Sequence, residues 1–352
     1  MATEVITSGL AGMNIFGNHA GLSGVGEKAK VEIVPWAPRY DEDDDDGDND
    51  EFEDPDEEAF AAHRRSWERR FSRRFGSFED ETTLGPMRHT QGPIPSNALP
   101  DGSLQFFGIS VTDLKPGLKW PLQVYGFVAT RDSADHNRNF LFRCTRNNSQ
   151  TLTRKDPYLL LTGPSRTVVL IDPVVFEFEL KLKGKTESED EVLAFKTFSF
   201  DERFNVEGGI RACSLHKRCN LDFMFALLEE SVEATVTAQV VEGSWLDDYG
   251  LKVICHTESM KEHEMVLLDS RGGKMPINSD GMIELSRRVI GVDYPSGKLV
   301  VWLVASCSNS FVPSTVAFSL KESGKSERDC DVWFCKVRVT VAWSLLSGPG
   351  YD

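Results

Sequence analysis

Residues 122–142 read LQVYGFVATRDSADHNRNFLF, and residues 156–184 read DPYLLLTGPSRTVVLIDPVVFEFELKLKG. Apolar runs of strand length alternate in both with Gly, Pro, Asp and Asn, which favour turns. Phe176, Phe178 and Leu180 alternate with charged residues, as in a strand with one apolar and one polar face. The stretch therefore predicts antiparallel β-strands around a core.

The same rhythm continues along the chain and predicts the fold class. Residues 221–228 could also form a helix, because LDFMFALLEE lacks β-branched residues. No amphipathic helix of ten residues or more separates the other strands, so we predict an all-β fold, an antiparallel β-sandwich over residues 103–345 with a tail at 346–352. Strands are predicted at 104–114, 122–129, 140–144, 158–161, 167–171, 176–183, 192–200, 210–218, 221–228, 232–241, 251–257, 264–268, 282–289, 298–305, 314–320 and 332–342.

Two short motifs recur at a spacing of 121 residues. Ser-Arg at 165–166 and Asp172 precede one apolar strand, and Ser-Arg at 286–287 and Asp293 precede another. The match raises the hypothesis that the sandwich consists of two related halves.

Charge is concentrated in one short run. Residues 41–58 hold fourteen acidic residues and no basic one, so the rest of the chain carries only -2 of the formal net charge of -16. A nearly neutral folded part gives no strong nucleic-acid signal. The acidic run is either a decoy for basic partners such as histones or a solubilising spacer, and the sequence favours the spacer.

Cysteine usage and hydropathy bear on localisation. The seven cysteines are odd in number and form no Cys-x-x-Cys pair, which favours a reducing compartment. No run of eighteen apolar residues and no secretory or transit signal occurs, so we expect no transmembrane segment and a cytoplasmic or nuclear protein.

The N-terminal arm divides into three parts. Residues 1–59 are predicted to be disordered, and residues 76–102, rich in Gly and Pro, form a linker. Residues 60–75 predict a short basic amphipathic helix, whose aromatic stripe either docks on the domain or serves a nuclear-import signal, an anionic-surface anchor or a groove ligand. The stripe comprises Phe60, Trp67, Phe71 and Phe75, and Arg65, Arg69 and Arg73 lie opposite.

The densest polar segment is RDSADHNRN, residues 131–139. With Asp156-Pro157-Tyr158 it resembles the start of a C2 domain, in which an aspartate-bearing loop helps to bind calcium. A second C2 loop supplies an Asp-x-Asp pair, but outside the acidic run such a pair occurs only at 329–331, far away in sequence. A calcium or lipid module using Asp132 and Asp135 is therefore an alternative, and we favour a structural turn in which Arg131 pairs with Asp132 and Arg138 also pairs.

Other reactive side chains give weaker patterns. Cys213, His216 and Cys219 suit zinc chemically, but their spacing along a strand is poor for chelation, so buried thiols and a surface histidine are expected. His216, His256 and His263 are candidate bases, but the sequence aligns no nucleophile with them. No Gly-x-Ser-x-Gly elbow or phosphate loop occurs.

The charged positions of the strand at 176–183 predict a solvated sheet face. Glu177 and Glu179 share that face with Lys181 and Lys183. We therefore assign no catalytic, metal-binding or cofactor-binding residue from the sequence. A hydrolase with an unrecognised site remains a further alternative.

Three blocks carry a family resemblance: LKWPLQVYGFVATRDSADHNRN, DPYLLLTGPSRTVVLIDPVVFEFELKLKGK and VLLDSRGGKMPINSDGMIELSRRVIGVDY. The chain resembles, from residue 87 to 342, a grass family whose members carry a C-terminal domain of unknown function. Some relatives join this domain to a ribosome-inactivating N-glycosidase and are linked to stress or defence. The Glu-Ala-x-x-Arg motif of that glycosidase is absent here, so its activity is not implied. We expect a non-catalytic β-sandwich that binds a protein partner.

Overall fold

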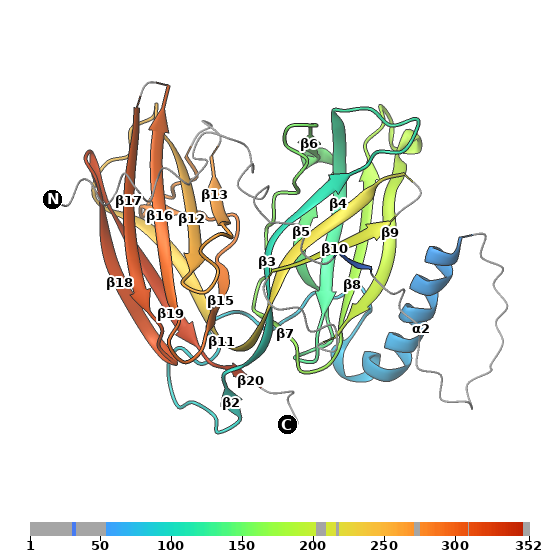
Figure 1. The fold of residues 1–352 in the computed structure, drawn as a ribbon, viewed down its shortest axis with the longest axis horizontal. Helices are drawn as coiled ribbons and strands as arrows, with labels where there is room; N and C mark the ends of the chain where they lie inside the picture. The colour runs from blue at the N-terminus through green and yellow to red at the C-terminus, as the bar shows by residue number, and fades with distance from the viewer. Residues whose placement is uncertain are drawn as a thin grey trace.

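The computed structural model describes residues 30–32, 54–201, 209–215, 218–270, 275–308 and 310–347. These residues form mostly antiparallel sheets arranged as two sandwiches side by side (Figure 1). The predicted all-β fold is confirmed. One nine-stranded sheet runs through both sandwiches and is faced by a five-stranded sheet in the first and a four-stranded sheet in the second.

The first sandwich packs the sheet β5-β4-β8-β9, with β6 on β4, against β3, β10 and the first half of β11. Its core is aromatic, and the rings of Phe176 and Phe198 stack at 4.5 Å. Its strands are β3 (Asp101–Thr112), β4 (Leu122–Arg131), β5 (Asn139–Cys144), β6 (Gln150–Leu152), β7 (Val168–Val169), β8 (Val174–Leu182), β9 (Glu191–Phe200), β10 (Gly209–Leu215) and part of β11 (Asn220–Gly243). Strand β1 (Lys30–Glu32) pairs with β10, and two short helices are η2 (Arg146–Asn148) and η3 (Glu187–Glu189).

The second sandwich packs the sheet β13-β12-β16-β17 against the second half of β11 with β14, β15, β19 and β18. Its core is mainly aliphatic, with Val253, Val301 and Val339 fully buried. Its strands are β12 (Gly250–Thr257), β13 (Met265–Asp269), β14 (Met282–Ile283), β15 (Val289–Asp293), β16 (Lys298–Cys307), β17 (Ser310–Ser319), β18 (Ser323–Val332) and β19 (Cys335–Ser344).

The two sandwiches share one design. The order β5-β4-β8-β9 in the first matches β13-β12-β16-β17 in the second. The 121-residue motif falls on equivalent positions, because Arg166 precedes β7 and Arg287 precedes β15, and both side chains are buried. The sequence match therefore coincides with a repeat of the architecture.

Strand β11 joins the two halves without a linker (Figure 1). Phe223 and Phe225 face the first core, whereas Ala226, Ala234 and Val236 face the second. The period-two alternation of a strand thus places the two sets of side chains on opposite faces. Two of the predicted strands, 221–228 and 232–241, are one strand, and the helical alternative for 221–228 is wrong.

Other strand predictions also differ from the structure, and one strand was not predicted. Residues 158–161 make only an isolated bridge at Tyr158, and 282–289 divides into β14 and the start of β15. Strand β18 is missed because its sequence, SGKSERDCDV, is polar. As an edge strand it pairs only with β19 and leaves most of its side chains in solvent, so apolar alternation is not required.

Helix α2 (Pro55–Phe75) covers the sheet of the first sandwich beside β9 (Figure 1). Asp54 caps it by accepting the Asp56 backbone N–H at 3.0 Å, and acidic residues in the first turn complement the helix dipole. Trp67 is buried, and the Phe60 ring lies 4.6 Å from that of Phe195, so the predicted aromatic stripe docks on the domain. The helix begins five residues before the predicted start, and 41–53 of the acidic run lie outside the described residues.

The segment predicted as a linker crosses both sandwiches. Phe78 is buried under α2, and Thr90 Oγ1 donates to the Trp343 carbonyl at 2.9 Å. Strand β2 (Ala98–Leu99) pairs with β20 (Leu346–Ser347), which lies in the predicted tail. Residues of the predicted linker and the start of the predicted tail therefore pack on the sandwiches.

One glycine tests how closely β4 and β8 approach. Gly126 has a φ of +120°, and a Cβ atom there would lie 2.0 Å from the Glu179 carbonyl oxygen. Gly126→Ala should lower the free energy of unfolding by about 3 kcal/mol, because backbone strain adds to the clash. Gly117→Ala is the control: its φ is also positive, +104°, but no atom lies within 4 Å of the added Cβ. Backbone strain alone should then lower the free energy of unfolding by about 1 kcal/mol. Urea unfolding compares them, and equal losses would contradict the close approach.

Candidate functional site

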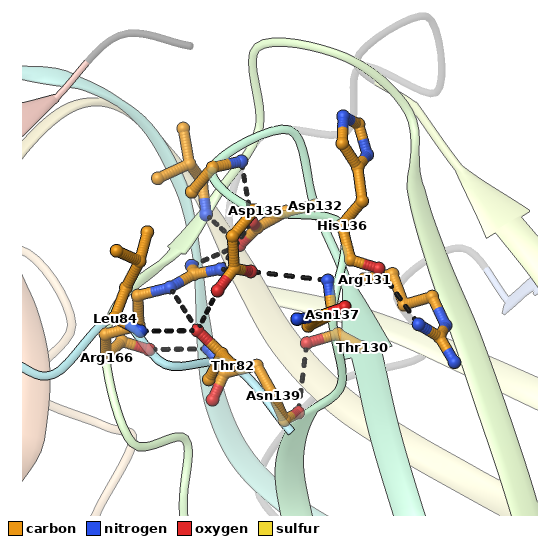
Figure 2. Close-up of polar contacts among 12 residues, drawn as sticks. Thr82, Leu84, Thr130, Arg131, Asp132, Asp135, His136, Asn137, Asn139 and Arg166 are labelled. Atoms are coloured by element: carbon orange, nitrogen blue, oxygen red, sulfur yellow. Dashed lines mark hydrogen bonds and ion pairs between the residues drawn. The ribbon is translucent and has the colours of Figure 1, made fainter. Parts of the chain in front are cut away.

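The polar segment between β4 and β5 is buried rather than open to solvent. Arg131, Asp132, Asp135, Asn137 and Arg138 are each less than 10% exposed. Figure 2 shows the side chains of Asp132 and Asp135 converging with Thr82 and Arg166 from other segments. The segment therefore forms a polar core at one end of the first sandwich.

Arg166 occupies both aspartates that a calcium site would use (Figure 2). Its guanidinium donates to the two Asp132 carboxylate oxygens at 2.7 and 2.8 Å and to Asp135 at 2.9 Å. Burial opposes the charge of Arg166, but the two carboxylates outweigh it and raise the guanidinium pKa. Asp132 also accepts the Val169 backbone N–H at 3.0 Å. A bidentate fork thus satisfies these oxygens from within the protein.

Glu177 is the second centre of the cluster, and its position corrects the predicted solvated face. Its fully buried carboxylate accepts hydrogen bonds from Arg131 and from Arg138 Nε, the latter at 2.7 Å. It also contacts His63 Nε2 at 2.7 Å. Burial alone would raise the Glu177 pKa, but Arg131, His63 and Arg138 hold it well below its usual range. Helix α2 covers this sheet face, so polar positions are buried too. Glu179, two residues on, stays about one third exposed.

The charged residues of the segment do not pair as predicted. Arg131 and Arg138 pair with Glu177, not with Asp132 inside the turn. The partners of the segment come instead from β8 and from Arg166. Sequence reasoning also missed His63, although it lies on the same helical stripe as Phe60 and Trp67.

Helix α2 fixes the backbone of the segment at His136. Trp67 Nε1 and Arg131 Nη1 donate to the His136 carbonyl at 2.7 and 2.9 Å. The Phe71 ring stacks on the His136 ring at 3.9 Å, and Asn137 donates to the Phe75 carbonyl. His136 itself has a φ of +54°, which is uncommon for a residue with a side chain.

The other candidate ligands and bases are dispersed. Cys219 is buried, and burial raises the pKa of its thiol to about 12, while the Cys213 side chain and His216 lie outside the described residues. Burial lowers the pKa of His256, and His263 contacts the Phe107 ring at 4.6 Å. Among the described residues, no three His, Cys, Asp or Glu side chains are placed to hold a metal ion.

A second feature was missed by sequence reasoning: an exposed apolar group at one end of the second sandwich. Strand register brings three connections together there, because Gly243 pairs with Cys335, Gly250 with Ser306, and Cys307 with Ser310. We call this group the aromatic end. It comprises Val241, Trp245, Leu246, Phe311, Trp333 and Phe334.

Trp333 protrudes most from the aromatic end. It is 69% exposed and forms with Phe334 the two-residue turn between β18 and β19. The Phe334 ring packs 5.2 Å from Trp245 and 5.1 Å from Tyr249, so the turn has a firm base. The predicted strand at 332–342 ran through this turn. The signal was available, since two large aromatics interrupt the alternation there.

Carboxylates border the aromatic end. Asp247, Asp248 and Asp331 are exposed beside it. The neighbouring Lys336 pairs with Glu242 at 2.7 Å, so its charge is already matched. The rim is therefore acidic.

The family comparison decides the identity of the domain. A model described as Domain of unknown function (DUF6598) matches residues 103–341, more than half of the chain. The chain belongs to the DUF6598 family. The DUF6598 domain thus spans both sandwiches, from β3 to β19. The resemblance to a family with a domain of unknown function is confirmed, and the grass origin stays a prediction. No curated protein matches the sequence.

Two solved structures resemble the DUF6598 protein only distantly. Human GIVD cytosolic phospholipase A2 is 11% identical with a TM-score of 0.23, and the match covers 70% of this chain. The chain spans 30% of the length of that phospholipase. The C2A and C2B domains of Extended-Synaptotagmin 2 are 8% identical with a TM-score of 0.24, covering 76% of this chain and 99% of that one. Neither likeness bears on activity.

Proposed function

We propose that this DUF6598 protein is a non-catalytic binding module whose aromatic end docks a protein partner. The supporting observation is Trp333, 69% exposed in a two-residue turn. Such turns favour Gly, Asn and Asp, so folding does not require a tryptophan there. Exposed tryptophans on a firm base are typical anchors of protein interfaces.

The acidic rim defines the partner. Asp247, Asp248 and Asp331 complement an apolar groove flanked by Lys or Arg. The same carboxylates are repelled by an anionic membrane. In the described part of the chain, no helix has the length and apolar content needed to cross a membrane.

Trp333→Ala tests the docking surface. Proteins that the full chain captures from extract are purified and titrated against the wild type and Trp333→Ala. The variant should bind them at least about 30-fold more weakly, a loss of about 2 kcal/mol of binding free energy. Val192→Ala, which shortens an exposed apolar side chain on the first sandwich, is the control and should bind normally. Added salt should slow association.

Three results would contradict this proposal. Equal affinity of the wild type and Trp333→Ala would remove the aromatic end as the contact. Binding to vesicles of anionic lipid would identify a membrane instead. Self-association that depends on Trp333, measured by sedimentation, would identify a second copy of the chain.

The alternatives have less support. A C2-like calcium site would have to displace Arg166 from Asp132 and Asp135. A hydrolase needs a nucleophile beside a base, but His63 contacts Glu177 and the His136 ring stacks on Phe71.

We infer a cytoplasmic or nuclear location, with a role in stress or defence among grasses as the family resemblance implies. Six described cysteines carry free thiols, which supports a reducing compartment. The outward arginines Arg65, Arg69 and Arg73 of α2 are exposed, which supports a role of the arm in solubility or localisation.

A further inference from the structure

A pocket of about 350 Å³ lies between α2 and the first sandwich. Its walls come from α2, from the segment after β4, and from the start of β8 and the end of β9. The volume is within the range of small-molecule sites. The proposed protein-docking surface is on the other sandwich, so this pocket is independent of it.

Several hydrogen-bonding groups of this pocket are unused. The hydroxyls of Ser66, Ser133 and Ser199 line it and make no hydrogen bond within the described residues. Ser133 is 7% exposed, and its Oγ is buried without a partner. Because buried polar atoms are normally hydrogen-bonded, unpartnered ones call for a physical explanation.

His136 contributes a ring held in a fixed position. Its φ of +54° is maintained by the bonds from Trp67 and Arg131 to its carbonyl, and backbone strain of this kind clusters at functional sites. Burial lowers the pKa of the ring, so the neutral imidazole offers one donor and one acceptor. Neither ring nitrogen bonds to another described residue.

The pocket has no excess charge for a ligand. The charges of Arg131 and Asp132 are matched inside the protein by Glu177 and Arg166. Arg70, Asp172 and Asp201 also line the pocket. Arg70 and Asp172 have opposite charges, and Asp201 already has an interaction within the protein. Phe71, Pro173 and Val175 supply an apolar wall.

We propose that this pocket binds a small neutral polyhydroxylated molecule, a sugar or polyol. Its hydroxyl groups pair with the serines and His136, and an apolar ring face lies against Phe71 and Pro173. A ligand with a net charge gains little there, because the opposite charges of Arg70 and Asp172 in the lining offset each other.

Saturation-transfer NMR with maltose, glucose and myo-inositol tests the proposal on the full chain. At least one probe should receive magnetisation from the protein, and Ser66→Ala/Ser199→Ala should raise its Kd at least tenfold. Those hydroxyls have no partner in the described structure, so the double variant should fold normally, as urea unfolding verifies. Ser244→Ala, which removes an exposed hydroxyl from the second sandwich, is the control and should leave the Kd unchanged.

Transfer to none of the three probes would overturn the proposal. So would an unchanged Kd in the double serine variant, because the sugar would then bind elsewhere. Tighter binding of inorganic phosphate or glycine, each competing at the same pocket, would overturn the neutral ligand class.

Discussion

Glu177→Gln should lower the free energy of unfolding by about 3–5 kcal/mol, because removing one partner leaves buried charges uncompensated. Arg131 and Arg138 would lose their carboxylate, and His63 of α2 would lose its contact with β8. Since Glu177 connects three segments, the helix should loosen first. We expect faster proteolysis within α2 as well as a lower urea midpoint.

Glu179→Gln is the matched control for this prediction. Glu179 lies two residues along the same strand, is about one third exposed and, among the described residues, pairs with Lys181 alone at 2.7 Å. Glu179→Gln should lower the free energy of unfolding by less than about 1 kcal/mol. If both glutamine variants unfolded at the same urea concentration, Glu177 would not be the centre of the cluster.

The pH dependence follows from the lowered pKa of folded Glu177. A lowered folded pKa contributes stability that is present above the unfolded pKa, about 4.3, and is lost as pH falls from there towards the folded pKa. The difference in free energy of unfolding between the wild type and Glu177→Gln should therefore be largest near pH 7 and shrink below about pH 4. A difference that grew on acidification would contradict this sign.

Arg166→Met should also be strongly destabilising, by about 3 kcal/mol or more, because Asp132 and Asp135 would remain buried without a cation. Arg287→Met is a control at the equivalent position of the repeat. Arg287 donates only to backbone carbonyls, of Val266 and Phe106, and burial lowers its pKa to about 10. Losing two such bonds should lower stability by about 1–2 kcal/mol. Equal losses in urea unfolding would contradict the role of the carboxylates.

Calcium provides a second measurement on the same residue. Because the Arg166 guanidinium occupies both aspartates, millimolar calcium should not change the melting temperature of the wild type. Stabilisation by calcium would mean that the ion displaces Arg166, and the C2-like alternative would then be correct.

The strands were predictable because the apolar or polar character of each side chain indicates whether it faces the core or the solvent. Phe176, Phe178 and Leu180 alternate and are all fully buried in β8. The aromatic stripe of α2 was predictable for the same local reason.

The cluster was not predictable, because its partners are distant in sequence. Glu177 looked solvated since a two-residue period assigns it to the outer face, and only the docking of α2 buries that face. Arg166 pairs with Asp132, which lies 34 residues away in sequence, because the fold brings the two side chains together. The aromatic end depends likewise on strand register, which brings three separate turns together.

The continuity of β11 restricts how the chain can change in length. Along this strand, Phe223 and Phe225 serve one core and Ala234 and Val236 the other, in strict alternation. Inserting one residue within β11 would exchange inner and outer positions for everything beyond it. Two added residues would preserve the alternation. Related sequences should therefore vary in length at the turns and keep the parity of this strand.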